Sequence, residues 1–275
     1  MIWKSPRRTE DLTHHGLIMG VLNVTPDSFS DGGRYFNPAD AVAHALQMEN
    51  DGAGILDIGG ESTRPGATAV NPEEELRRIL PVVRAVREQT QCLISIDTMK
   101  AAVAAAAMDA GADIINDISG LRADPDMAAV AAHTGAGVVL MHMQGTPQTM
   151  QHQPAYEDVI REIQDSLRRS MEIAVAAGVA PAAIALDPGI GFGKTLEHNL
   201  AILRNLDAFS LDSRPVLLGV SRKSFISRIT GSPDRKWPTL ALTSYARGKG
   251  VRILRVHDVK ENVQALRMTE AILQK

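Results

Sequence analysis

Short apolar runs recur along the chain and are separated by longer amphipathic or alanine-rich stretches. The runs are residues 18–23, 55–59, 93–97, 114–118, 138–142, 184–189, 216–221 and 253–257. They are apolar throughout and do not alternate with polar residues, which predicts strands of a parallel sheet that is covered on both faces. The intervening segments predict helices. Residues 156–178, for example, carry apolar side chains about one helical turn apart from Val159 to Met171 and end at Gly178.

Eight strand–helix units in one chain predict an α/β fold, a single-domain (β/α)8 TIM barrel over residues 17–275. A doubly wound open sheet is the competing architecture, but no Gly-x-Gly-x-x-Gly motif follows the first predicted strand. Residues 1–16 are polar and match no specific pattern, so we expect either a disordered or a capping N-terminal extension.

Composition and charge bear on whether the protein binds nucleic acid or enters a membrane. The 275 residues are 44% hydrophobic and 22% charged, with a net charge of −3 and scattered Lys and Arg, which disfavours a nucleic-acid partner. No apolar run has the length of a membrane span and the N-terminus lacks the apolar segment of a signal peptide, so we expect neither membrane insertion nor export. The single cysteine, Cys92, lies in an apolar run and fits a cytoplasmic location.

Polar residues stand at or near the carboxyl end of every predicted strand. They are Asn23, Asp57, Asp97, Asn116, His142, Asp187, the trio Ser221, Arg222 and Lys223, and the pair Arg255 and His257. In a barrel these ends converge on one face, where active sites are built. A single Asp at such a place is usually a cap or turn residue, but this does not explain eight ends out of eight. For Asp57 and Asp117, a loop-holding role and a ligand-binding role remain equally open.

These residue types suit a small molecule with two different parts. Carboxylates and an amide suit a flat heterocycle with N–H donors beside ring nitrogens, because a carboxylate can accept two parallel hydrogen bonds. The cationic or imidazole side chains of Arg64, Lys223, Arg255 and His257 suit a phosphate-type anion. The sequence has no Cys/His cluster for a tight zinc site and no Gly-x-Ser-x-Gly nucleophile motif.

Eight motifs follow one another in an order that resembles a known family. They are GVLNVTPDSFSDGG (20–33), DIGGESTRPGA (57–67), SIDT (95–98), NDISG (116–120), MHMQGTP (141–147), DPGIGFGK (187–194), GVSRKSF (219–225) and RVHDV (255–259). From about residue 17 to its C-terminus the chain resembles the bacterial dihydropteroate synthases, pterin-binding TIM-barrel enzymes. The resemblance implies a transferase of folate biosynthesis that joins 6-hydroxymethyl-7,8-dihydropterin diphosphate to p-aminobenzoate and releases diphosphate.

The resemblance also implies roles for individual residues. The pterin would contact Asp97, Asn116, Asp187 and Lys223. The diphosphate would contact Thr63, Arg64, Arg255 and His257, with Mg²⁺ as cofactor at Asn23. The p-aminobenzoate would contact Phe29, Pro65, Phe192, Ser224 and the stem of Lys223. The residues expected to be catalytic are Asp97, Lys223, Arg255 and His257.

The family chemistry is dissociative, so diphosphate would leave before the amine attacks. The loops after the first two strands would close over the site and exclude water. The resemblance also implies a homodimer. The chain has Trp237-Pro238-Thr239 where the family is expected to have Gly-Thr opening the last helix, which bears on the packing of this helix and on any dimer contact.

Two alternative functions share these features. A corrinoid-dependent methyltransferase of the same superfamily would have the Asp/Asn pterin pocket but no use for the SRKSF motif or a diphosphate clamp. A non-catalytic pterin-binding paralogue is disfavoured by the intact set of motifs. An assay of p-aminobenzoate-dependent diphosphate release would separate the three functions.

Overall fold

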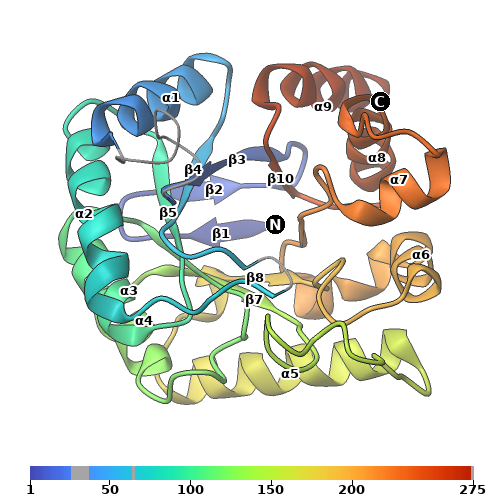
Figure 1. Ribbon diagram of the computed structural model, residues 1–275, viewed down its shortest axis with the longest axis horizontal. Coiled ribbons are helices and arrows are strands. Elements are labelled where there is room, and N and C mark those ends of the chain that lie inside the picture. Colours follow the sequence, from blue (N-terminus) through green and yellow to red (C-terminus); the bar gives the residue numbers. More distant parts are fainter. Residues whose placement is uncertain (26–36, 64–65, 274–275) are drawn as a thin grey trace.

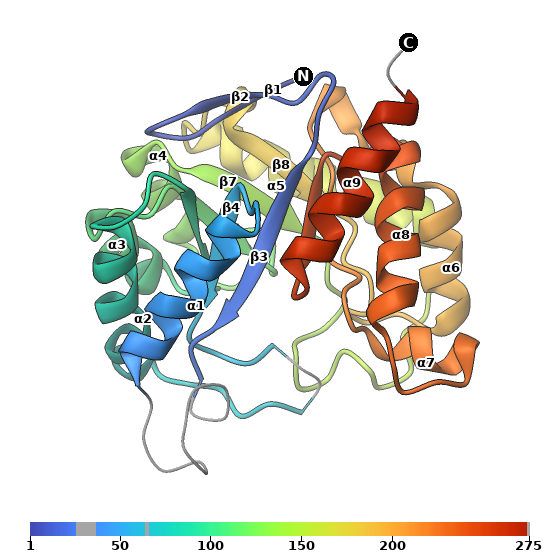
Figure 2. The same ribbon diagram turned by 90° about the horizontal axis from the view of Figure 1, so that it is seen from above.

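Eight parallel strands form a barrel that is surrounded by helices (Figures 1 and 2). The structure is a computed structural model, and it describes residues 1–25, 37–63 and 66–273. The strands are β3 (Leu17–Asn23), β4 (Ile55–Gly59), β5 (Leu93–Asp97), β6 (Ile114–Asp117), β7 (Gly137–Met141), β8 (Ile184–Asp187), β9 (Leu217–Leu218) and β10 (Ile253–Val256). Their order is β8-β7-β6-β5-β4-β3-β10-β9, and a parallel bridge between Leu186 and Val216 brings the two ends of the sheet together. The predicted (β/α)8 fold is confirmed.

The helices lie outside the barrel, and all but the last one, α9, connect successive strands (Figure 1). They are α1 (Pro38–Asn50), α2 (Pro72–Arg87), α3 (Ala101–Asp109), α4 (Met127–Thr134), α5 (Val159–Ala176), α6 (Leu196–Arg204), α7 (Ser224–Thr230), α8 (Lys236–Gly248) and α9 (Val259–Leu273). Short polar side chains begin several of them. Asn71 accepts a hydrogen bond from the backbone N–H of Glu74, and Thr195 forms a reciprocal capping box with His198.

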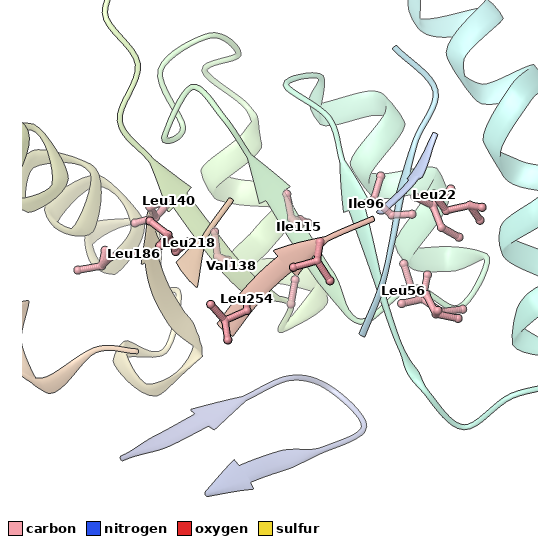
Figure 3. Close-up of a cluster of buried hydrophobic side chains, with 14 of the residues drawn as sticks. Leu22, Leu56, Ile96, Ile115, Val138, Leu140, Leu186, Leu218 and Leu254 are labelled. Atoms are coloured by element: carbon pink, nitrogen blue, oxygen red, sulfur yellow. The ribbon is translucent and has the colours of Figure 1, made fainter. Parts of the chain in front are cut away.

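Both faces of each strand are buried, which explains the uninterrupted apolar runs. One set of side chains points outward and packs against the helices, and Figure 3 shows members of this set from all eight strands, such as Leu22, Leu56 and Leu254. The alternate positions point inward. Their apolar members are Met19, Ile55, Leu93, Ile114, Val139, Ala185, Leu217 and Ile253. This inner cluster fills the amino half of the barrel, so the barrel is packed and has no open pore there.

A short N-terminal hairpin closes the amino end of the barrel. Strands β1 (Ile2–Lys4) and β2 (Thr9–Asp11) pair antiparallel, and Figure 2 shows them at the end from which β3 points away. Trp3 is 2% exposed and Leu12 is fully buried, both within the inner apolar cluster. The indole N–H of Trp3 donates to the carbonyl of Ala183 at 2.9 Å. Of the two alternatives for the N-terminus, the described residues form a cap.

Candidate active site

Inward positions change from apolar to polar toward the carboxyl ends of the strands. Two residues beyond the apolar inner positions come Asp57 on β4, Asn116 on β6, Asp187 on β8 and Arg255 on β10. Because strand side chains alternate with a period of two, these groups point into the same interior as the apolar cluster beneath them. The polar groups therefore form a floor above a packed apolar base.

Arg255 joins two carboxylates at the centre of this floor. Its Nε donates to Oδ2 of Asp57 at 2.6 Å, and its Nη2 donates to Oδ2 of Asp97 at 2.7 Å. Burial disfavours the charged guanidinium, but the two carboxylates outweigh burial, and the pKa of Arg255 is raised above its usual range. Arg255 therefore stays cationic.

Asp97 has one carboxylate oxygen that is paired with Arg255 and one that is not. Burial raises the pKa of Asp97 to about 7, although the charge of Arg255 acts in the opposite direction. Its Oδ1 is buried and has no hydrogen-bond partner among the described residues. Asp97 lies in register between Gly59 and Asn116 on the neighbouring strands, and Gly59 pairs with Asn23. Asn23 on β3 and Asp97 on β5 are therefore at the same level of the barrel, with Gly59 of β4 between them.

Asp57 has a role in the site that the sequence left open. It is fully buried and accepts hydrogen bonds from Nδ2 of Asn116, at 3.3 and 3.2 Å, as well as from Arg255. It therefore orients two of the predicted ligand-binding side chains. Asp117 instead holds a loop, since it accepts from the backbone N–H groups of Ser119 and Leu121. The alternation of side chains along a strand distinguishes the two residues. Asp57 faces the barrel interior, as Ile55 does two residues earlier, whereas Asp117 faces outward, next to the inward-facing Asn116.

Asp187 ends β8 and turns into a glycine-rich loop. Its Oδ1 accepts a hydrogen bond from the backbone N–H of Gly189 at 2.7 Å. Burial raises the pKa of Asp187 to about 6, although this hydrogen bond acts in the opposite direction. Gly189 has a φ of +71°, and a Cβ there would lie 1.9 Å from the carbonyl oxygen of His142. Glycine is therefore required for this loop to approach the end of β7.

Lys223 and Phe192 are in direct contact. The Lys223 ammonium lies 4.1 Å from the centroid of the Phe192 ring, a cation–π geometry. Burial lowers the pKa of Lys223 to about 8, and the nearby charge of Arg255 adds to the effect. Arg222 has a φ of +57° and pairs with Asp258 at 2.5 Å, so its side chain turns away from that of Lys223.

Ser221 and His257 follow two adjacent strands, β9 and β10. The Ser221 hydroxyl lies 3.0 Å from Nδ1 of His257 and accepts the backbone N–H of the same residue at 3.2 Å. Burial, followed by the charge of Arg255, lowers the pKa of His257 to about 4. The imidazole is therefore neutral near pH 7.

Lys194 is a buried lysine that our reading of the sequence did not single out. It is 4% exposed, and its ammonium lies 3.0 Å from Nδ1 of His142 and 2.9 Å from the carbonyl oxygen of Phe192. Burial lowers the pKa of Lys194 to about 7. These contacts join the loop after β7 to the loop after β8. The signal in the sequence was a charged residue at the end of the glycine-rich turn DPGIGFGK.

The remaining predicted site residues lie on loops. Thr63 is half-buried in the segment after β4, and Ser224 is exposed at the first position of α7. Phe29, Arg64 and Pro65 lie outside the described residues, and so do parts of the two loops that we expect to close over the site. Their contacts stay predictions. Along the described chain, no helix combines the length and apolar character needed to cross a membrane.

Comparisons with known proteins agree with this geometry. The family model described as pterin binding enzyme matches residues 19–257. Dihydropteroate synthase of Escherichia coli (strain K12) is 48% identical over 265 residues, which span 96% of this chain and 93% of that protein.

Solved structures give the same result. A Yersinia pestis dihydropteroate synthase with a sulfonamide drug complex is 44% identical, with a TM-score of 0.92 over 99% of each chain. A Xanthomonas albilineans dihydropteroate synthase with 4-aminobenzoic acid is 42% identical, with a TM-score of 0.90 over 99% of this chain and 100% of that chain. The resemblance seen in the motifs is thereby confirmed. The chain belongs to the pterin-binding enzyme family and, within it, to the dihydropteroate synthases.

Proposed function

We propose that this protein joins 6-hydroxymethyl-7,8-dihydropterin diphosphate to p-aminobenzoate and so forms 7,8-dihydropteroate and diphosphate for folate biosynthesis. The observation that carries the proposal is the polar floor of the barrel, where the carboxylates of Asp97 and Asp187 and the amide of Asn116 lie beside Arg255 and Lys223. This arrangement occurs in a chain that is 48% identical to a dihydropteroate synthase. The corrinoid-dependent methyltransferase and the non-catalytic paralogue have no comparable support.

The floor supplies complementary groups for a pterin. Asp187 would accept the pair of N–H donors of the ring, because one of its oxygens is already fixed by the N–H of Gly189 and the carboxylate is therefore oriented. The amide of Asn116 is oriented by Asp57. The unpartnered Oδ1 of Asp97 would accept a further N–H donor.

The cationic side chains would stabilise the departing diphosphate. Two N–H groups of Arg255 are used by Asp57 and Asp97, which leaves other donors of its guanidinium for an anion. We place His257, Thr63 and Arg64 with Arg255 on the diphosphate. In the bond changes, the C–O bond to diphosphate breaks first, the amine nitrogen of p-aminobenzoate then forms the C–N bond, and this nitrogen releases one proton. Stabilising the leaving group and orienting the amine are therefore the main tasks of the protein.

The second substrate would lie above the pterin. Its ring would pack on Phe192, whose face is already covered at 4.1 Å by the Lys223 ammonium, and its carboxylate would meet Ser224. Phe29 and Pro65 complete this part of the proposal. Phe192 is 9% exposed, so its position is fixed before any substrate binds.

A magnesium ion fits the available oxygen donors. No group of three or more His, Cys, Asp or Glu side chains within residues 1–25, 37–63 and 66–273 could hold a metal on its own. Mg²⁺ often needs only one or two protein oxygens, because substrate phosphates and waters complete its shell. We therefore propose that the amide oxygen of Asn23 holds it together with the diphosphate. When bound, the ion would neutralise charge on the leaving group.

Two further proposals concern the molecule as a whole. Cys92 is a free, buried thiol, and burial raises its pKa to about 12, which suits a protein of the cytoplasm.

We also propose a homodimer that forms through α7, α8 and α9. Large apolar side chains are exposed on these helices, namely Ile229, Trp237, Tyr245, Met268, Ile272 and Leu273.

The decisive experiment is an assay of diphosphate release by the purified protein. Release should require both the pterin diphosphate and p-aminobenzoate, and it should stop in excess EDTA and return with Mg²⁺. Asn23→Ala should raise the Mg²⁺ concentration needed for half-maximal release, whereas Asn50→Ala, at the exposed end of α1, should not. Pterin binding without release would identify a non-catalytic paralogue. Undiminished turnover in EDTA would remove Mg²⁺ from the proposal.

A further inference from the structure

Ser221 makes two contacts with one histidine and is itself 6% exposed. Its Oγ accepts the backbone N–H of His257 at 3.2 Å and lies 3.0 Å from Nδ1 of the imidazole. The two residues follow β9 and β10, which are neighbours in the barrel, so the contact is fixed by the sheet. The fixed geometry makes it possible to assign the proton on the imidazole.

A serine hydroxyl has one hydrogen to donate and two lone pairs to accept. If Nδ1 of His257 carried the ring proton, Oγ would accept twice and its own hydrogen would need another acceptor. The described residues offer Ser221 no other side-chain partner. An unpaired buried donor is costly. If Nδ1 is unprotonated, the hydroxyl donates to it and both contacts are satisfied.

The neutral ring then carries its proton on Nε2. We propose that Ser221 is a positioning residue that holds His257 in the Nε2–H tautomer, so that the outer nitrogen of the ring donates a hydrogen bond to a phosphate oxygen. The low pKa of His257 supports this assignment, because a neutral ring has only one N–H to present. The alternative tautomer would present the Nε2 lone pair to the anion and repel it.

The tautomer of His257 and its hydrogen bond to phosphate depend on different contacts. The tautomer follows from the contacts of Ser221 and does not depend on the substrate. The hydrogen bond to phosphate rests on the proposed function. A spectroscopic experiment on the free protein and a kinetic experiment on variants therefore test the two claims independently.

Nitrogen NMR of protein labelled with ¹⁵N-histidine reads the tautomer directly. The chain has eight histidines, and the signals of His257 would be assigned by their loss in His257→Gln. At pH 7 the His257 ring should show a protonated Nε2 and an unprotonated Nδ1. A protonated Nδ1 in the wild-type protein would overturn the assignment, whatever the enzyme catalyses.

Variants of Ser221 test the consequence. Ser221→Ala should yield a mixture of tautomers and lower kcat/KM for the pterin diphosphate about tenfold, as expected for a lost hydrogen bond to a charged group. The KM for p-aminobenzoate should not change. Ser221→Thr keeps the hydroxyl and should restore both the tautomer and the kinetics.

Each outcome has a defined meaning. Unchanged tautomer and unchanged kinetics in Ser221→Ala would overturn the role of Ser221. A shifted tautomer without a kinetic change would overturn the hydrogen bond to phosphate. If Ser221→Ala did not fold, as judged by its NMR spectrum, the tautomer of the wild-type protein and the tautomer and kinetics of Ser221→Thr would still test the role of Ser221. If the wild-type protein released no diphosphate, the proposed function would fail and the tautomer assignment would stand on its own spectrum.

Discussion

Asp187 is buried at the end of β8, and the pKa of its carboxyl group is raised toward neutral pH. Burial raises this pKa from the usual value to about 6, so the folded protein holds the group as a carboxylic acid below that pH. Only the carboxylate accepts two N–H donors at once. Pterin binding should therefore depend on pH through this residue.

We predict that pterin affinity, measured by calorimetry, falls as pH is lowered through about 6, because protonation of Asp187 removes an acceptor. Asp187→Ala should bind pterin about one to two orders of magnitude more weakly at pH 8, as expected for unpaired buried donors, and should lack this part of the pH dependence. Asp207→Ala, at an exposed position of a short 3-10 helix, is the matched control. Normal pterin binding by Asp187→Ala would show that the pocket lies elsewhere.

The sequence indicated most of the floor but not how its members are held. Asp97, Asn116, Asp187 and Arg255 could be predicted because each stands at the end of an apolar run. The role of Asp57 depends on two partners that are distant in the sequence, Asn116 and Arg255, and only the closed barrel brings them within hydrogen-bond distance. Lys194 was missed for a similar reason, because its partners lie on the backbone and on the end of a different strand.

At the level of elements, the uninterrupted apolar runs and amphipathic segments were predictable, and the N-terminal hairpin was not. The eight barrel strands follow the apolar runs, since burial on both faces leaves a clear pattern. The hairpin strands have three residues each and are mostly polar, so their pattern is too short to read. The hairpin forms because Trp3 and Leu12 are buried against the barrel, a tertiary effect that local sequence does not record.

The hairpin should contribute measurably to stability. Trp3→Ala should lower the free energy of unfolding by roughly 3–5 kcal/mol, because it leaves a cavity in the inner cluster and frees the carbonyl of Ala183. Ile2→Ala is the matched control on the same strand, since Ile2 is 43% exposed, and it should change stability little. Urea denaturation followed by circular dichroism would measure both. Equal effects would mean that the hairpin does not act as a cap.

At the level of the whole molecule, exposed apolar side chains are grouped on the last three helices. Figure 1 shows α7, α8 and α9 on the same side of the barrel. Met268 and Ile272 lie one turn apart on α9 and are 64% and 71% exposed. Large apolar groups that are exposed together usually mark an interaction surface.

We predict that the protein is a dimer in light scattering and that Met268→Glu combined with Ile272→Glu makes it monomeric, because charges would be buried without partners. Ile173→Glu is the control, since Ile173 is 40% exposed but lies on α5. The double variant should remain folded. A wild-type monomer, or a dimer that survives the double substitution, would exclude this face.

The N-terminal hairpin also bears on the side from which a ligand would reach the polar floor. Trp3 and Leu12 belong to the apolar base, so the amino end of the barrel is closed along its axis. A pterin bound as proposed at Asp187 and Asn116 would enter from the carboxyl ends of the strands, and a p-aminobenzoate packed on Phe192 would lie between the pterin and the solvent. On the proposed function, the pterin diphosphate would therefore have to bind before p-aminobenzoate. The closed amino end of the barrel would thus set the order in which the two substrates bind, although it touches neither of them.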